Sequence, residues 1–126
     1  MYNEIIMNNF NNPQNVGELK GADGIVKAQS KKYGDVIKFF IKVDENKKIT
    51  EATFKSVGCV ATIAISSALT VKMVGMSVDR VAKMEVEQIS ALVGGLPEIK
   101  TYCAVLAKEA LVGVVNNYKK RMAKQA

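Results

Sequence analysis

The chain has 126 residues, of which 48% are apolar and 24% charged, and this is enough for one domain with a core of its own. It contains two cysteines and no histidine, which removes the commonest general base and the commonest nitrogen ligand for a metal. The net charge of +6 comes from dispersed lysines without interleaved aromatic residues, so it favours a solvated surface or an acidic protein partner over nucleic acid.

The first residues carry no basic segment ahead of an apolar one, which is not the pattern of a secretory signal. The longest apolar run, residues 57–69, is shorter than the roughly 20 residues that cross a bilayer. We therefore expect a cytoplasmic chain without a membrane span. In that compartment the two cysteines are expected to be free thiols rather than a disulfide.

Alternating apolar residues predict strands in the first half of the chain. In residues 35–43 apolar side chains fall at every second position, with lysines on the other face. These apolar residues are Ile37, Phe39, Ile41 and Val43. Segments 24–29 and 49–57 flank this strand beyond two turn-like sequences, and in the second segment Ala52 and Phe54 are expected to point inward. The pattern predicts a small antiparallel meander of three strands.

The apolar spacing changes to a helical period after Gly58. Residues 60–74 predict a mostly buried helix, and short helices are expected over 78–84, with Ser77 as N-cap, and over 86–93. After Pro97 an apolar stripe with spacings of three and four residues predicts a long amphipathic helix. The stripe comprises Cys103, Leu106, Ala107, Ala110, Leu111, Val114, Val115 and Tyr118.

Strands followed by helices indicate an α+β fold. We expect a three-stranded antiparallel sheet from the N-terminal half, with the helices of the C-terminal half packed on it. No linker, repeat or low-complexity stretch interrupts the chain, so a single domain over residues 1–126 is expected.

Three residues are candidates for chemistry. Cys59 precedes the first long helix and Cys103 lies in the first turn of the last, where free N–H groups and the helix dipole favour a thiolate. Each is a candidate metal ligand or nucleophile, although cysteine also serves as a small apolar core residue. Asp35 follows Gly34 at the start of a strand, where an aspartate is usually a turn residue. The residues by themselves leave these alternatives open.

Taken in order, four segments resemble the NifU/IscU family of iron-sulfur cluster assembly scaffold proteins. They are NVGELKGADG, GDVIKFFIKVDEN, FKSVGC and LPEIKTYCAVLAKEA, and the resemblance runs from about Phe10 to Tyr118. It implies a small antiparallel sheet covered by helices, in agreement with the strands and helices predicted from the apolar pattern. It also implies a labile 2Fe-2S cluster, assembled with sulfur from a cysteine desulfurase and passed to acceptor apoproteins.

The resemblance implies a site of three cysteines and one aspartate. The three cysteine positions match Tyr33, Cys59 and Cys103 in this chain, and the aspartate matches Asp35. Asp35, Cys59 and Cys103 are therefore the expected metal ligands, and by the same analogy Cys103 is a candidate persulfide acceptor. Tyr33 stands at the family's first cysteine, and Tyr102 at a family histidine. Tyr33 is the weakest expected ligand, because a phenol with an ordinary pKa of about 10 loses its proton only if the metal displaces it.

The segment LPEIK resembles the family's chaperone-recognition loop, LPPVK. Its residues Leu96, Pro97, Glu98, Ile99 and Lys100 are the expected partner-binding residues. Glu98 replaces the second proline, which weakens the case for a chaperone partner.

We expect a carrier rather than an enzyme, one that binds iron or a labile 2Fe-2S cluster and passes it on. One chain supplies only two thiolates for four-coordinate iron, so further ligands would come from Asp35 and Tyr33, from a small thiol, or from a second subunit in a homodimer. Zinc is an alternative metal at the same residues. The alternative function is a cluster-free paralogue that acts as a regulatory or heteromeric partner of a desulfurase or of a true scaffold.

Overall fold

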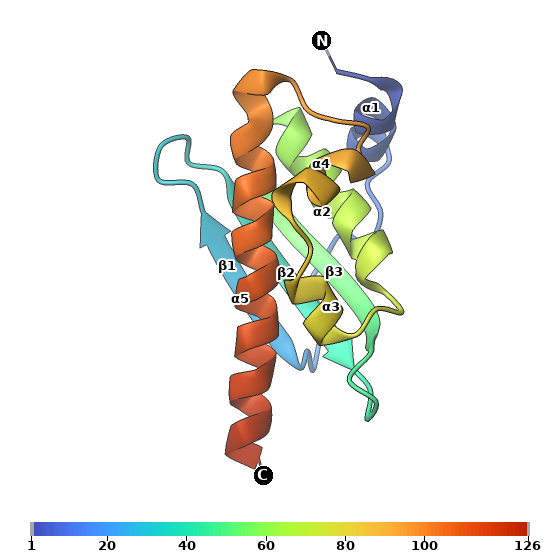
Figure 1. Ribbon diagram of the computed structural model, residues 1–126, viewed down its shortest axis with the longest axis vertical. Coiled ribbons are helices and arrows are strands. Elements are labelled where there is room, and N and C mark those ends of the chain that lie inside the picture. Colours follow the sequence, from blue (N-terminus) through green and yellow to red (C-terminus); the bar gives the residue numbers. More distant parts are fainter. Residues whose placement is uncertain (1, 126) are drawn as a thin grey trace.

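The computed structural model describes residues 2–125 and places three strands between a short first helix and the remaining helices (Figure 1). The elements are α1 (Glu4–Asn11), β1 (Gly24–Gln29), β2 (Val36–Val43), β3 (Ile49–Val57), α2 (Val60–Met73), α3 (Val78–Ala82), α4 (Val86–Leu92), the 3-10 helix η1 (Glu98–Lys100) and α5 (Thr101–Gln125). The predicted α+β order is confirmed.

The strands form one antiparallel sheet in the order β1-β2-β3. The side chains of Ile37, Phe39 and Ile41 on its inner face have no exposed surface, as the alternation predicted. Burial of each such side chain contributes about 1.5–3 kcal/mol relative to an exposed one. Val43 is only partly buried, because a β-bulge beside Lys42 shifts the register with β3 at this point.

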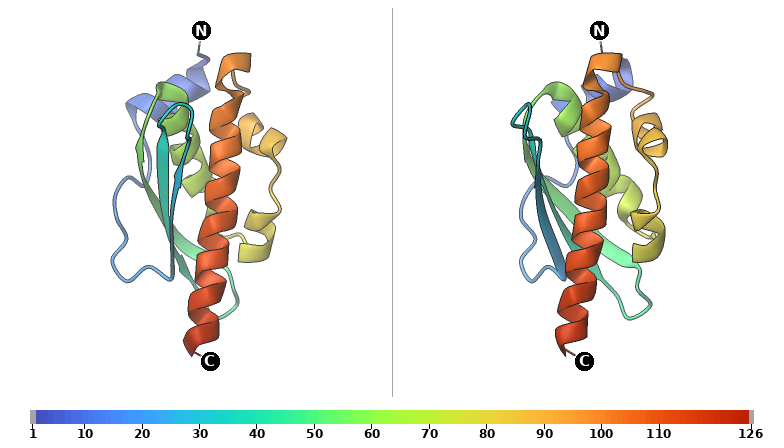
Figure 2. Two further views of the ribbon diagram at one scale, coloured as in Figure 1. Left: turned by 90° about the vertical axis from the view of Figure 1, so that its left-hand side faces the viewer. Right: turned by 60° about the vertical axis from the view of Figure 1, so that its left-hand side comes forward.

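The helices cover one face of the sheet, as the side views in Figure 2 show. α5 packs along β1 and β2, α2 packs on β3, and α3 and α4 pack against α5. α2 packs against α1, β3, α4 and α5. Its residues Ala61, Ala64, Ile65 and Leu69 have no exposed surface. The predicted buried helix is thus confirmed, and the core lies between it, α5 and the sheet.

The coil between α1 and β1 runs beside the outer edge of β3. The amide of Gly17 donates to the carbonyl of Phe54 at 2.8 Å, and the amide of Phe54 donates to the carbonyl of Asn15 at 3.0 Å. These bonds satisfy part of an edge that would otherwise be open to another strand.

Two helices differ from the sequence prediction. α1 was not expected, because an eight-residue helix with one fully buried residue, Ile6, leaves almost no periodic signal. Asn3 fixes its start by accepting a hydrogen bond from the Ile6 amide at 2.8 Å. The second is α3, which has Ser77 as N-cap, as predicted, but ends at Ala82. Within residues 2–125 none of the helices combines the length and the apolar character needed to span a membrane.

Three segments distant in sequence meet at one end of the molecule. The loop between β1 and β2, the start of α2 and the start of α5 all lie at the end opposite the C-terminus (Figure 1). This convergence positions the residues described next.

Candidate metal centre

The three expected metal ligands come together at this end. Asp35 directly precedes β2, Cys59 is the N-cap of α2, and Cys103 lies in the first turn of α5. One donor atom from each lies within 4.8 Å of the other two, and the two sulfur atoms are 3.8 Å apart. Two thiolates on one tetrahedral metal, with metal-sulfur bonds of about 2.3 Å, would also be separated by roughly 3.8 Å. The separation therefore fits joint coordination of one ion without movement of the helices.

Burial of these donors differs from one residue to the next. Cys103 has no exposed surface, Asp35 is 5% exposed, and Cys59 is partly exposed. A buried carboxylate beside buried sulfur is costly unless a cation or hydrogen bonds compensate its charge. The donor set therefore suits a metal ion that enters from the side of Cys59.

Thr62 connects the three donors. Its hydroxyl donates a hydrogen bond to Oδ2 of Asp35 and lies 3.4 Å from the sulfur atoms of both Cys59 and Cys103. Thr62 is fully buried on α2. The sequence analysis did not predict Thr62 as a site residue. Its position three residues after Cys59, which puts both side chains on one face of the helix, could have indicated it.

Gly58 allows the carboxylate of Asp35 to approach the start of α2. A Cβ atom at position 58 would lie 2.6 Å from Oδ2 of Asp35, which is closer than non-bonded atoms approach. Gly34, with φ of +78°, turns the chain just before Asp35 through a conformation that other residues rarely adopt. The two glycines thus bring the strand and helix termini into contact.

The two thiols differ in acidity. Burial raises the pKa of the Cys59 thiol, but hydrogen bonds with Thr62, Tyr102 and Cys103 outweigh this effect, so the pKa lies below its ordinary value. Burial, together with the negative charge of Cys59, raises the pKa of Cys103 to about 11. Cys59 is therefore the first sulfur to become a thiolate, and Cys103 needs a metal to displace its proton.

Residues 1–125 match the sequence family described as "NifU-like N terminal domain". The chain belongs to this family. It is 38% identical over 130 residues to the iron-sulfur cluster assembly enzyme IscU of Drosophila melanogaster, covering 99% of this chain and 82% of that protein. It is 34% identical over 118 residues to the iron-sulfur cluster assembly scaffold protein IscU 1 of Archaeoglobus fulgidus, covering 94% and 76%.

The fold is similar to that of an N-terminal NifU-like protein from Brucella abortus, with a TM-score of 0.68 and 19% identity, over 98% of this chain and 95% of that one. The NifU/IscU resemblance inferred from the sequence motifs is thereby confirmed, and so is the fold that it implied.

Two stacked phenols lie beside the thiols of this NifU-family chain. The hydroxyl of Tyr102 lies 3.9 Å from the sulfur of Cys59, and burial raises the pKa of Tyr102 above its usual value, so the phenol remains a hydrogen-bond donor. The ring of Tyr33 stacks on that of Tyr102 with centroids 4.1 Å apart. Tyr33 is half-exposed and contacts Tyr102, whose hydroxyl faces the Cys59 sulfur. Its role as a ligand stays a prediction.

The segment 96–100 borders the same site. Ile99 is 71% exposed, and the ammonium group of Lys100 lies 5.8 Å from the centre of the Tyr102 ring. The negative charge of Cys59 raises the pKa of Lys100, so this lysine is a cation that favours the Cys59 thiolate. The sequence predicted a partner-binding role for Lys100 but not its electrostatic contact with the metal centre.

Proposed function

We propose that this NifU/IscU-family chain is an iron-sulfur cluster assembly scaffold that binds iron or a labile 2Fe-2S cluster at Asp35, Cys59 and Cys103 and passes it on. The observation that carries the proposal is the convergence of these donors within 4.8 Å of one another. The names of the relatives support the same role, since they are called iron-sulfur cluster assembly and scaffold proteins.

The donor set suits transient cargo better than a permanent structural metal. A structural metal site is usually closed by four protein ligands, whereas a site with three protein ligands leaves a position for an exchanging group. Asp35, Cys59 and Cys103 provide three, and Cys59 is partly exposed. The last position is left for Tyr33, a small thiol or a donor from another subunit. Zinc would compete for the same three residues.

Thr62 is a positioning residue in this proposal. By donating to Oδ2 of Asp35 it holds the carboxylate beside the two sulfur atoms. Hydrogen bonds of this kind orient metal ligands, and their loss typically costs 10–100-fold in metal affinity.

Cysteine desulfurase and acceptor apoproteins are the proposed partners. The Cys59 thiolate attacks the terminal sulfur of a desulfurase persulfide, forms a new sulfur-sulfur bond and releases the desulfurase thiolate. Cys103 was the acceptor implied by the family resemblance, but its full burial and raised pKa favour Cys59 as the first thiol to react. The exposed Ile99 beside the site suits contact with such a partner.

The test is anaerobic reconstitution with iron and sulfide, followed by transfer to an apo-ferredoxin. Wild-type protein should show a sulfur-to-iron charge-transfer spectrum and then convert the acceptor to its holo form. Cys59→Ser should do neither while keeping its far-UV circular dichroism. A colourless wild type would contradict the proposal and favour the cluster-free partner of a desulfurase.

A further inference from the structure

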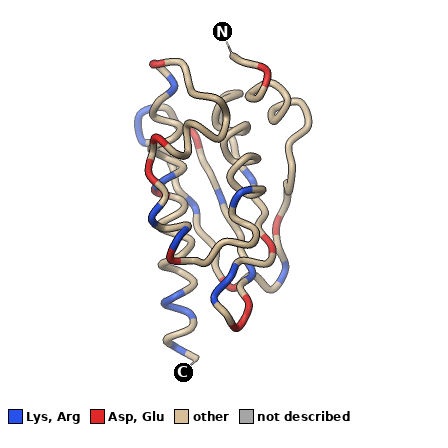
Figure 3. Tube along the Cα trace, turned by 45° about the vertical axis from the view of Figure 1, so that its right-hand side comes forward, with Lys and Arg blue, Asp and Glu red and all other residues tan. Residues whose placement is uncertain are grey.

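A second concave region lies between α2, α3 and α4, away from the metal centre and sharing no residue with it. Figure 3 turns this side of the molecule forward. The groove has a volume of about 500 Å³. Its lining includes Lys72, Arg80 and Lys83, which are exposed, and the apolar side chains of Met76, Met84 and Leu92.

The three cations of the groove form no close ion pair with a carboxylate of residues 2–125. Among residues 2–125, no carboxylate lies within 4.0 Å of the charged groups of Lys72, Arg80 or Lys83. Asp79 is next to Arg80 in sequence, but its carboxylate pairs with Lys119 on α5 at 2.8 Å and interacts with Lys83 only at longer range. Like charges that gather without close ion pairs raise the positive potential of the groove and attract anionic groups.

The apolar part of the groove extends beyond the cations. A neighbouring hollow of about 280 Å³ shares Lys72 and Leu92 with it and adds Ala68 and Val71, the latter 55% exposed. The two hollows therefore adjoin at Lys72 and Leu92. Methionine side chains such as Met76 adapt to differently shaped apolar groups, which suits a surface that accepts a peptide.

We propose that this groove binds a short acidic segment of a partner protein. Carboxylates of the segment pair with Lys72, Arg80 and Lys83, and an apolar side chain between them packs on Met76 and Met84. The combination favours a peptide over nucleic acid, because no aromatic residue lines the groove to stack a base. It also favours a peptide over a small inorganic anion, which would leave the apolar lining uncovered. This docking surface goes beyond the scaffold function and does not depend on metal loading.

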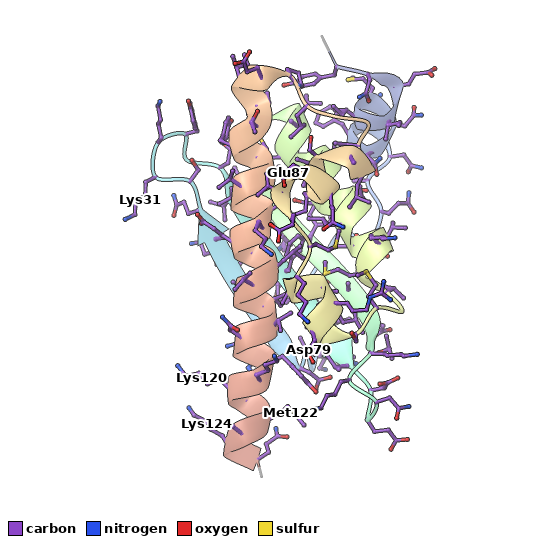
Figure 4. All side chains as sticks on the ribbon, viewed as in Figure 1. Lys31, Asp79, Glu87, Lys120, Met122 and Lys124 are labelled. Carbon is purple, nitrogen blue, oxygen red and sulfur yellow. The ribbon has the colours of Figure 1, made fainter. Side chains whose placement is uncertain are left out.

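The test uses a short fluorescein-labelled peptide in which glutamates alternate with leucines, with binding read by fluorescence anisotropy. The groove variant carries Lys72→Glu, Arg80→Glu and Lys83→Glu. The matched control carries Lys31→Glu, Lys120→Glu and Lys124→Glu, exposed lysines labelled in Figure 4 that lie outside the groove and give the same change in net charge. All six positions are exposed, so both variants should keep the fold, which circular dichroism checks.

The groove variant should lose about tenfold or more in peptide affinity, and the control only about two- to threefold. In wild-type protein the peptide should shift the amide resonances of Met76, Met84 and Ala91 but not that of Cys59. Equal losses in both variants would overturn the proposal, since they indicate non-specific attraction. Equal affinity for a peptide without leucines would also overturn the proposal. Self-association that needs the groove, seen by sedimentation without peptide, would assign the surface to a second copy and overturn it too.

Discussion

The candidate metal centre and the groove use charge in opposite ways. At the candidate metal centre, two of the potential anions, Asp35 and Cys103, are buried and Cys59 is partly buried, and Thr62 connects them through hydrogen bonds and close contacts. In the groove, the cations are exposed on long side chains, and none forms a close ion pair with a carboxylate of the described residues 2–125. A site built from short, buried side chains is sensitive to atomic geometry, whereas a site built from long, exposed ones is sensitive to net charge. Substitutions that move atoms without changing charge should therefore affect only the metal centre.

The largest expected difference is between the two thiols themselves. In metal-free protein at neutral pH, iodoacetamide should alkylate Cys59 about 100-fold faster than Cys103. The pKa of Cys59 is below its ordinary value, whereas that of Cys103 is raised to about 11, and each pKa unit changes the thiolate fraction about tenfold. Because the thiolate is the reactive form, the alkylation rate of Cys59 should reach its plateau at a lower pH than that of an ordinary cysteine.

Peptide mass spectrometry over time and pH measures both rates. The unfolded protein in urea is the control, since its two cysteines should react alike. Equal rates in the folded protein would contradict the assigned burial of Cys103.

A methyl group at position 58 should disrupt the metal centre without any change in charge. Gly58→Ala places a carbon 2.6 Å from the Asp35 carboxylate, so the carboxylate must move away from the thiols. We expect Co²⁺ affinity to fall about 10- to 100-fold. Gly95→Ala is the matched control, because position 95 also has a positive φ, of +93°, but has open space for the new carbon. Equal Co²⁺ affinity in the two variants would show that the approach of Asp35 is irrelevant to binding.

Removal of the Thr62 hydroxyl should have a somewhat smaller effect. Thr62→Val keeps the shape of the side chain but leaves Asp35 without its hydrogen bond, and we expect Co²⁺ affinity to fall about tenfold. Thr62→Ser keeps the hydroxyl and should retain most of the affinity, as isothermal titration can show. A loss in the serine variant as large as in the valine variant would mean that packing, not the hydrogen bond, matters.

The smallest effect is expected at the ion pair beside the groove. Lys119 lowers the pKa of Asp79 through a hydrogen bond and its charge. At pH values above the pKa of Asp79 in the unfolded chain, the pair therefore stabilises the folded state. This stabilisation is lost as the pH falls through the lower folded-state pKa. Because the pair is exposed, Asp79→Asn should change the melting temperature only slightly at pH 7, and the difference from wild type should vanish in acid. A large change at pH 7 would contradict a surface role for this pair.

The sequence predicted those parts of the molecule that depend on local signals. The alternation in β2 and the helical stripe of α5 are local, and so are the positions of Cys59 and Cys103 at helix starts. The proximity of Asp35 to both thiols depends on packing between distant segments, and only the family resemblance indicated it. Thr62 was missed for the same reason, since within the α2 sequence it is one more small residue in an apolar run.

The groove had no sequence signal either. Its cations are separated along the chain at positions 72, 80 and 83, and only the packing of α2, α3 and α4 brings them together. Composition showed an excess of positive charge without showing where it gathers. A cation can be identified as lacking an ion pair only when the partners of nearby carboxylates, such as that of Asp79, are known.

The most direct test of the metal centre is anaerobic titration of the reduced, metal-free protein with Co²⁺, read by sulfur-to-cobalt charge-transfer absorption. The structure predicts saturation at one Co²⁺ per chain in the wild type. Cys59→Ser and Cys103→Ser should each bind more weakly and show reduced absorption, because each removes one of the two sulfur ligands. A wild type without this absorption, or either serine variant with an unchanged titration, would contradict the assignment of Cys59 and Cys103 to one metal site.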